Sequence, residues 1–201
     1  MRLALAMLVL GCCICCCDLA RADTAVVTPD RVCAIQHAIR WHHAEWPDWQ
    51  CLRVSEAINA AAEKTGQRPV TLLAIAVTES DLRPNVEHWY GDIAPGTSGD
   101  LGLMGVRCKL GPNMLCSNGV LRGWKYPAAM RIEANVMLAA RILASKPTLN
   151  DYNGGKGYAE RIRAIAAAIM GVRVPVASKR VRKLIGQIVG AIARMQEGRT
   201  S

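Results

Sequence analysis

The sequence of 201 residues contains no phenylalanine, and its aromatic content is only 4%. Its core must therefore be filled by Leu, Ile, Val, Ala and Met side chains. Charged residues are also few, at 20% against 51% hydrophobic residues, which excludes a wholly disordered chain. Acidic residues are outnumbered 16 to 25 by Lys and Arg, and the formal net charge is +9. This imbalance favours polyanionic partners such as peptidoglycan with its peptide carboxylates, anionic lipid or nucleic acid, without choosing among them.

Several patterns that carry chemistry in other proteins are missing. We find no internal repeat and no alternation of strand and helix signals, so a solenoid or a parallel α/β fold is not expected. No nucleophile elbow marks a serine hydrolase. The cysteine spacings match no common zinc pattern, and His37, His42 and His43 do not share one helix face. We therefore predict no metal site and no cofactor.

The N-terminus has the composition of a targeting segment. Arg2 precedes an apolar run from Leu3 to Cys17, and Ala20-Arg21-Ala22 forms an A-x-A cleavage signal. The run is short for a permanent membrane anchor. We predict a signal peptide over residues 1–22 and export to the periplasm or the outside. The alternative is a lipoprotein signal, because residues 9–12 resemble a lipobox that would leave a lipid on Cys12.

Cleavage after residue 22 removes five of the nine cysteines and leaves Cys33, Cys51, Cys108 and Cys116. An even number of cysteines in an exported chain indicates disulfides, and four allow three connectivities. We expect Cys33–Cys51 and Cys108–Cys116, because each pair closes a short local loop.

Apolar periodicity indicates a mainly helical domain over residues 23–172, followed by a basic amphipathic helical extension over 173–201. Thr28 and Ser178 are expected helix N-caps. The predicted helices span about 29–43, 52–64, 69–80, 127–145, 158–170 and 178–195, with a turn at 150–155. Residues 84–118, rich in Gly, Pro, Asn and Asp, predict a long loop region that could contain a short hairpin or a helical turn. Loops of this length in a compact domain are usually functional.

Glu79 ends the helix predicted over 69–80, which is apolar nearly all round. Desolvation there favours the neutral carboxylic acid and raises its pKa. A protonated glutamic acid near neutral pH is the general acid that glycosidic bond cleavage requires. The alternative is a solvated glutamate at a helix end.

Four segments, in order over about residues 50–170, resemble the motifs of the lytic transglycosylase family. They are Glu79-Ser80 with Asp81-Leu82-Arg83-Pro84-Asn85; Asp100-Leu101-Gly102-Leu103-Met104; Asn135 within Ile132-Glu133-Ala134-Asn135; and Tyr152-Asn153-Gly154-Gly155 with Tyr158. The Asp-Leu before Gly-Leu-Met is closest to the secretion- and conjugation-associated branch. Gly105 departs from the family, which usually has Gln after Gly-Leu-Met, and this departure puts one substrate contact in doubt.

The resemblance implies a lysozyme-like fold of the goose-type or transglycosylase-like kind, with a long active-site loop region. It implies that Glu79 protonates the bond between N-acetylmuramic acid and N-acetylglucosamine, then accepts the proton of the muramyl C6 hydroxyl. The product would be a 1,6-anhydro sugar. No cofactor is implied. The implied partners are peptidoglycan strands and a secretion, conjugation, pilus or phage apparatus, without nucleic acid.

The substrate contacts that the resemblance suggests are Ser80, Gly102, Leu103, Met104, Tyr152, Asn153 and Tyr158. The hydroxyl of Tyr152 could orient the Glu79 carboxylate, or Tyr152 could be half-buried and fix the turn, and the two roles can coexist. Met104 could line the sugar site or belong to the core. His88 and Trp89 lie in the loop predicted to overhang the cleft, where they would stack on sugar rings or pin the loop locally.

Three alternatives stay open. A hydrolytic muramidase would usually need a second carboxylate, for which Asp92 and Asp100 are candidates, although both also suit loop hydrogen bonding. A catalytically weak peptidoglycan-binding protein would fit Gly105. A membrane-active effector would use the basic C-terminal helix, which could instead pack on the domain, bind anionic membrane or peptidoglycan, or dock on a partner.

Overall fold

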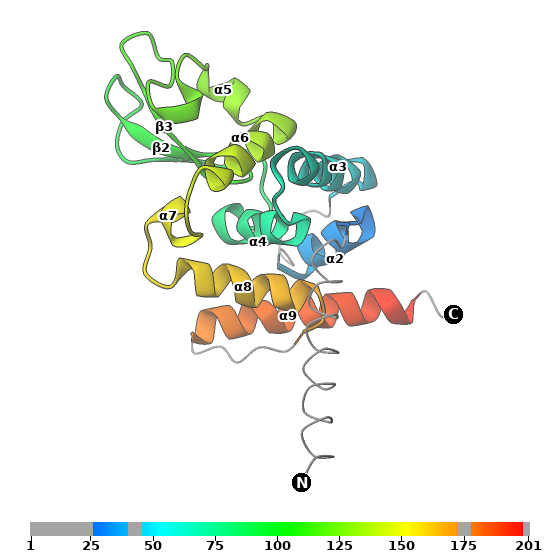
Figure 1. The fold of residues 1–201 in the computed structure, drawn as a ribbon. Coiled ribbons are helices and arrows are strands. Elements are labelled where there is room, and N and C mark those ends of the chain that lie inside the picture. The colour runs from blue at the N-terminus through cyan, green and yellow to red at the C-terminus, as the bar shows by residue number, and fades with distance from the viewer. Residues whose placement is uncertain (1–25, 40–45, 173–177, 199–201) are drawn as a thin grey trace.

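The structure, a computed structural model, describes residues 26–39, 46–172 and 178–198. The predicted signal peptide, the Cys12 lipid site, and His42 and His43 at the predicted end of the first helix lie outside these residues. The described chain is mainly helical and carries one small three-stranded sheet (Figure 1). The mainly helical class expected from the sequence is confirmed.

The longer helices follow the predicted ones closely. Thr28 accepts a hydrogen bond from the Arg31 amide at 3.4 Å, and Ser178 accepts one from the Val181 amide at 3.5 Å, so both predicted N-caps are confirmed. One helix begins four residues earlier than predicted, directly after Pro47. The helices are α2 (Pro29–Ile39), α3 (Asp48–Thr65), α4 (Pro69–Ser80), α6 (Ile132–Ala144), α8 (Tyr158–Ile169) and α9 (Lys179–Glu197).

Helix α4 lies in the middle of the helical body, packed against α3 and α8 (Figure 1). Every residue from Leu72 to Val77 is completely buried. Gly66 ends α3 in the left-handed conformation, with φ of 69°, and Pro69 occupies the first turn of α4. The apolar sequence thus places the end of α4, with Glu79, beside the core.

Residues 84–118 contain the short hairpin that the sequence allowed for, and a third strand extends it into a sheet. They form an antiparallel sheet of β1 (Glu87–Trp89), β2 (Ser98–Leu101) and β3 (Val106–Lys109), in that order. Strands of three and four residues are too short to show a clear alternation of polar and apolar residues, which is why the sequence did not fix their positions. The sheet and α5 (Tyr126–Ala129) form one end of the molecule, and α9 lies at the other (Figure 1).

The helix predicted over 127–145 is interrupted. It consists of α5 and α6, separated at Met130 and Arg131. The Asn135 side chain donates a hydrogen bond of 2.8 Å to the Ala129 carbonyl, which replaces a helical main-chain bond at the break. A 3₁₀ turn, η1 (Gly119–Leu121), precedes this region, and the turn predicted at 150–155 contains the short helix α7 (Asn150–Asn153).

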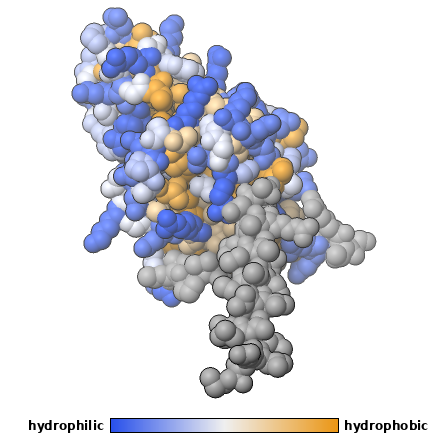
Figure 2. Space-filling model, in the orientation of Figure 1, coloured by the Kyte–Doolittle hydropathy of each residue, from blue (hydrophilic) through white to orange (hydrophobic). Residues whose placement is uncertain are grey.

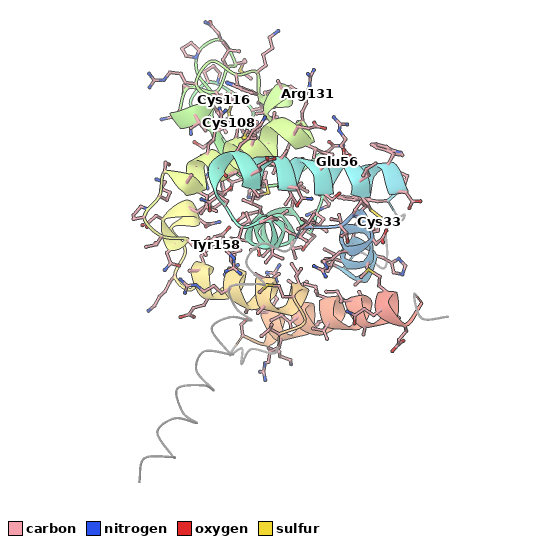
Figure 3. All side chains as sticks on the ribbon, turned by 45° about the vertical axis from the view of Figure 1, so that its right-hand side comes forward. Cys33, Glu56, Cys108, Cys116, Arg131 and Tyr158 are labelled. Carbon is pink, nitrogen blue, oxygen red and sulfur yellow. A yellow bond between two sulfur atoms is a disulfide. The ribbon has the colours of Figure 1, made fainter. Side chains whose placement is uncertain are left out.

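Both expected disulfides are present. Cys33–Cys51 joins α2 to α3 with a Cα–Cα distance of 5.4 Å, and Cys108–Cys116 joins β3 to the following loop at 5.3 Å (Figure 3). Two disulfides fit a protein of an extracytoplasmic, oxidising compartment.

Helix α9 packs against α2 and α8. In its apolar stripe Val181, Ile188 and Ile192 are at most 7% exposed, and Leu184 and Ile185 are partly buried. Of the three roles considered for the basic extension, packing on the domain is therefore the one observed. Within the described ranges, no helix is long and apolar enough to cross a membrane.

Candidate active site

Glu79 occupies the last turn of α4, where its side chain is partly buried. The helix ends in two consecutive left-handed residues that are not glycine, Asp81 with φ of 51° and Leu82 with φ of 61°. Such a backbone is costly for residues with a Cβ atom and is often found at functional sites. Leu82 is completely buried and anchors this turn in the core. The turn directs the chain away from Glu79 towards β1.

Two side chains from the α7–α8 region hold one oxygen of the Glu79 carboxyl group. The Tyr158 hydroxyl donates to Oε1 at 2.6 Å, and the Asn153 amide donates to the same atom at 3.0 Å. The segment 152–158 therefore meets the Glu79 segment as expected, although more than 70 residues separate them. Figure 3 shows Tyr158 at the beginning of α8.

The pKa of Glu79 is raised above its ordinary value. Burial is the largest cause, because desolvation disfavours the charged form, and the negative charge of Asp100 adds to it. The hydrogen bonds from Tyr158 and Asn153 act in the opposite direction, as does the positive charge of Arg161. The protonated acid consequently persists to higher pH than in a solvated glutamate.

Gly105 lies directly against the second carboxyl oxygen. A Cβ atom built at this position would lie 2.9 Å from Glu79 Oε2 and 3.1 Å from Glu79 Cβ. Its φ of 58° is also in the left-handed region that favours glycine. With this backbone, a glutamine at position 105 would have a strained φ and would require the Glu79 side chain to shift. The departure from the family pattern is therefore matched to the local geometry.

Of the two roles suggested for Tyr152, the structure shows the fixing of the turn and not the orientation of the Glu79 carboxyl group. The Tyr152 hydroxyl donates to the Met104 carbonyl at 2.9 Å, and the hydroxyl that bonds the Glu79 carboxyl group belongs to Tyr158. The two tyrosine rings are stacked, with centroids 6.1 Å apart. Burial raises the pKa of both hydroxyl groups, so both remain neutral hydrogen-bond donors. Tyr152 thus fixes the turn before β3 against the α7–α8 region.

Five residues suggested as substrate contacts are buried, namely Ser80, Gly102, Leu103, Met104 and Tyr158. Leu103 and Met104 have no exposed surface, and Ser80 is 1% exposed. The Ser80 hydroxyl lies 2.7 Å from the Leu103 carbonyl oxygen and faces the interior. In this structure these residues therefore support the site rather than line it.

Asn135, which was not among the predicted site residues, organises the same turn. It is completely buried, accepts a hydrogen bond from the Met104 amide at 2.7 Å and donates to the Leu101 carbonyl at 2.9 Å. A Cβ atom at Gly102 would lie 2.6 Å from its amide nitrogen, so Gly102 provides close approach. Its place in the Asn-containing helix motif was the only sequence signal.

His88 and Trp89 belong to β1 and take part in a local aromatic cluster. The His88 ring meets Tyr90 edge-on at 4.9 Å, and Trp89 meets Tyr126 edge-on at 5.4 Å. Trp89 also covers Gly99, where a Cβ atom would lie 2.6 Å from the indole ring. These contacts fit the role of pinning the loop.

Neither candidate for a second carboxylate is hydrogen-bonded to Glu79. Both oxygens of Asp100 are engaged by Arg107, and the Tyr90 hydroxyl donates to one of them. Arg107 also lies over the Tyr90 ring at 4.8 Å. Asp92 lies in the loop between β1 and β2, where its main-chain carbonyl accepts from Thr97 at 2.7 Å. In the described part of the chain, no three His, Cys, Asp or Glu residues are grouped to hold a metal ion.

Comparisons of this chain with protein-family models, curated proteins and solved structures found no match.

Proposed function

We propose that this protein is an exported peptidoglycan lytic transglycosylase with a lysozyme-like fold and Glu79 as its single catalytic acid and base. The observation that carries the proposal is the Glu79 carboxyl group itself. It ends a buried helix, its pKa is raised mainly by burial, and Tyr158 and Asn153 hold one of its oxygens. A positioned carboxylic acid of this kind suits protonation of a glycosidic oxygen.

The proposed reaction restores Glu79 to its starting state. The proton of Glu79 passes to the oxygen between N-acetylmuramic acid and N-acetylglucosamine, and the bond from that oxygen to the muramyl anomeric carbon breaks. The muramyl C6 oxygen then bonds to the anomeric carbon, and its proton returns to Glu79. The products are a 1,6-anhydromuramyl end and a free hydroxyl on N-acetylglucosamine.

This reaction needs neither an attacking water nor a second carboxylate. The engagement of Asp100 by Arg107 and Tyr90 supports it over a hydrolytic muramidase, which usually uses two free carboxyl groups. Export is supported by the two disulfides and by the composition of the N-terminus. Local opening of the wall for a secretion, conjugation, pilus or phage apparatus is the biological role that we associate with this activity.

The test is digestion of purified sacculi, with mass spectrometry of the released fragments. We expect anhydromuropeptides from the wild type and a loss of about 10²–10⁴-fold with Glu79→Gln, the usual range for removing a general acid. The matched control is Glu56→Gln, because Glu56 is an exposed carboxylate on α3 away from Tyr158 (Figure 3). The control should retain full activity.

Other products would identify the alternatives. Reducing-end muropeptides from the wild type would contradict the transglycosylase and indicate a muramidase. Sacculus binding without any cleavage, equal for the wild type and Glu79→Gln, would indicate a peptidoglycan-binding protein. Lipid leakage without wall cleavage would indicate a membrane-active effector.

A further inference from the structure

A large hollow lined by described residues lies beside Glu79, which is not itself part of the lining. The volume of the hollow is about 1680 Å³, and α8 contributes both exposed and buried residues to its lining. Thr78 and Asp81 from the end of α4, and Lys156 and Gly157 just before Tyr158, line its edge. The hollow therefore borders the two segments that hold the candidate acid.

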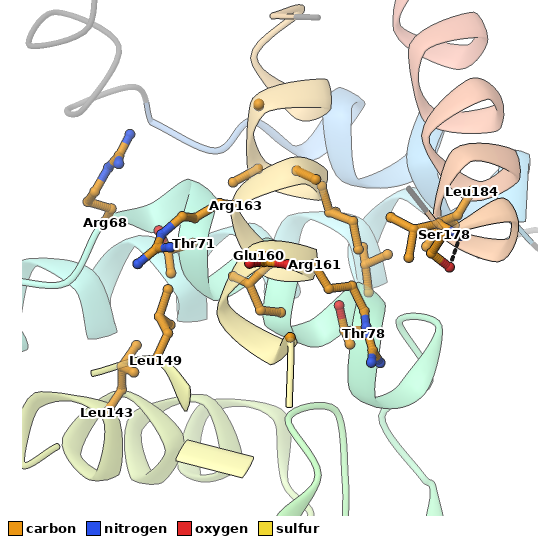
Figure 4. A pocket seen from close by; sticks show the side chains of 18 of the residues that line it. Arg68, Thr71, Thr78, Leu143, Leu149, Glu160, Arg161, Arg163, Ser178 and Leu184 are labelled. Carbon is orange, nitrogen blue, oxygen red and sulfur yellow. Dashed lines mark hydrogen bonds between the residues drawn. The ribbon is translucent and has the colours of Figure 1, made fainter. Parts of the chain in front are cut away.

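The lining of this hollow, here called the α8 groove, is strongly basic. Its edges carry Lys146, Lys156, Arg161, Arg163, Arg180 and Lys183, all exposed, while only Asp81 and Glu160 are acidic. These six basic groups form no ion pair with any residue described by the structure. Figure 4 shows Arg163 directed towards Thr71 and Arg161 towards Thr78, on opposite sides of α8.

Apolar side chains form part of the lining. Leu143, Leu149 and Leu184 contribute to it, and Figure 4 shows them among the polar groups. On the face seen in Figure 2, a central strip of apolar atoms is bordered by hydrophilic side chains. The groove exceeds the 300–1,000 Å³ typical of small-molecule pockets, so an extended ligand with both carboxylates and small apolar groups fits it better than a compact one.

We propose that the α8 groove binds the peptide stems of peptidoglycan through their carboxylates. This inference rests on the proposed function, because a glycan strand with its reacting bond at Glu79 would carry its peptide stems towards the neighbouring surface. Stem peptides carry alanine methyl groups and free carboxylates. The methyl groups complement the leucine side chains of the groove, and the carboxylates complement its Lys and Arg side chains. Binding of the stems selects strands that carry peptides over bare glycan.

The test uses the full-length protein with Glu79→Gln, so that strands are bound without being cut. We expect soluble strands with peptide stems to bind about tenfold more tightly than strands stripped of their peptides, because several exposed ion pairs each add a few-fold in affinity. Arg163→Glu together with Lys183→Glu should abolish this preference. Rising salt should also weaken it, because exposed charges are screened.

The matched control is Arg122→Glu with Lys125→Glu, which changes the net charge equally on exposed residues that do not line the groove. It should leave the preference for stem-bearing strands intact. Amidation of the stem carboxylates should remove the preference as the groove variant does. Thermal unfolding of all variants reports whether the fold is retained.

Two results would overturn the inference. One is equal binding of stem-bearing and stripped strands. The other is binding of phosphatidylglycerol vesicles, but not of stem-bearing strands, that depends on Arg163 and Lys183. Either result leaves the proposed function standing if the wild type still releases anhydromuropeptides. Conversely, strand binding that depends on the groove, without anhydromuropeptide release by the wild type, would support stem binding by the α8 groove and contradict the proposed transglycosylase activity.

Discussion

At the scale of single residues, the Glu79 carboxyl group is subject to effects of opposite sign. Burial and Asp100 raise its pKa, whereas Tyr158, Asn153 and Arg161 lower it. The net direction is upward, so burial and Asp100 together outweigh the two hydrogen bonds and Arg161, and burial is the largest cause. Both burial and the hydrogen bonds suit a general acid. Burial keeps the carboxyl group protonated, and the hydrogen bonds fix its orientation.

Replacement of Tyr158 by phenylalanine separates these effects. Tyr158→Phe removes the hydroxyl that lowers the Glu79 pKa and keeps most of the ring that excludes water, so this pKa should rise further. Since Glu79 must start protonated, the high-pH limb of the activity profile should move to higher pH. The rate should fall about tenfold or more, because a hydrogen bond to a charged group contributes about 1.5–3 kcal/mol. The measurement is the pH dependence of anhydromuropeptide release.

The same substitution has a consequence for stability. The pKa of Glu79 is higher in the folded protein than in the unfolded chain, so the protonated carboxyl group stabilises the fold. This stabilisation is complete below the unfolded pKa and is lost as pH rises through the folded pKa. In Tyr158→Phe this loss should extend to higher pH, which thermal unfolding across pH would show.

Tyr126→Phe is the control, because no residue of the described chain hydrogen-bonds the Tyr126 hydroxyl. If the pH dependence of anhydromuropeptide release is the same in Tyr158→Phe as in the wild type, the Tyr158 hydroxyl does not lower the pKa of Glu79.

At the scale of elements, Asn135 connects α6 to the turn between β2 and β3. It makes three hydrogen bonds to main-chain groups of Met104, Leu101 and Ala129 in a completely buried position. Replacement by aspartate keeps its size but turns two donated bonds into contacts between oxygen atoms. We expect Asn135→Asp to lower the free energy of unfolding by at least about 3 kcal/mol, measured by urea denaturation.

Asn118 provides the comparison for this prediction. Its side chain accepts from the Lys109 amide and donates to the Arg107 carbonyl, but its bonds are exposed. Water can replace them, so Asn118→Asp should cost less than about 1.5 kcal/mol. Equal costs for the two substitutions would show that burial of Asn135 is not the cause.

The elements also show how far the sequence predicts this fold. Gly66 and Pro69 mark the boundary between α3 and α4, and the apolar run identifies α4 as buried, because these signals are local. The sheet and the break between α5 and α6 depend on contacts between distant residues, such as that of Asn135 with Leu101, and short strands lack a periodic signal. Glu79 and Asn153 could be named because each stands in a local motif. The choice of Tyr158 over Tyr152 as partner of the carboxyl group depends on a contact between distant residues, so only the structure shows it.

At the scale of the whole molecule, the two disulfides lie in different parts of the fold. Cys33–Cys51 ties α2 to α3 in the helical body, and Cys108–Cys116 lies in the sheet end that carries Gly105 and the turn against Glu79 (Figure 3). Both pairs restrict the unfolded chain by closing loops, of 18 and 8 residues in sequence separation. Their effects on stability should therefore be similar, whereas their effects on the site should differ.

Removal of each disulfide by paired alanine substitutions tests this division. Loop-closure entropy predicts a loss of about 3 kcal/mol for Cys33→Ala with Cys51→Ala and about 2.5 kcal/mol for Cys108→Ala with Cys116→Ala, measured by denaturant unfolding. At a temperature where both variants remain folded, the first should keep its rate on sacculi. The second should lose rate and exchange its β2 and β3 amide hydrogens faster, because the sheet end that presses Gly105 against Glu79 has lost its cross-link. A rate loss confined to the variant without Cys33–Cys51 would contradict this prediction and would show that the helical body, not the sheet end, determines the geometry around Glu79.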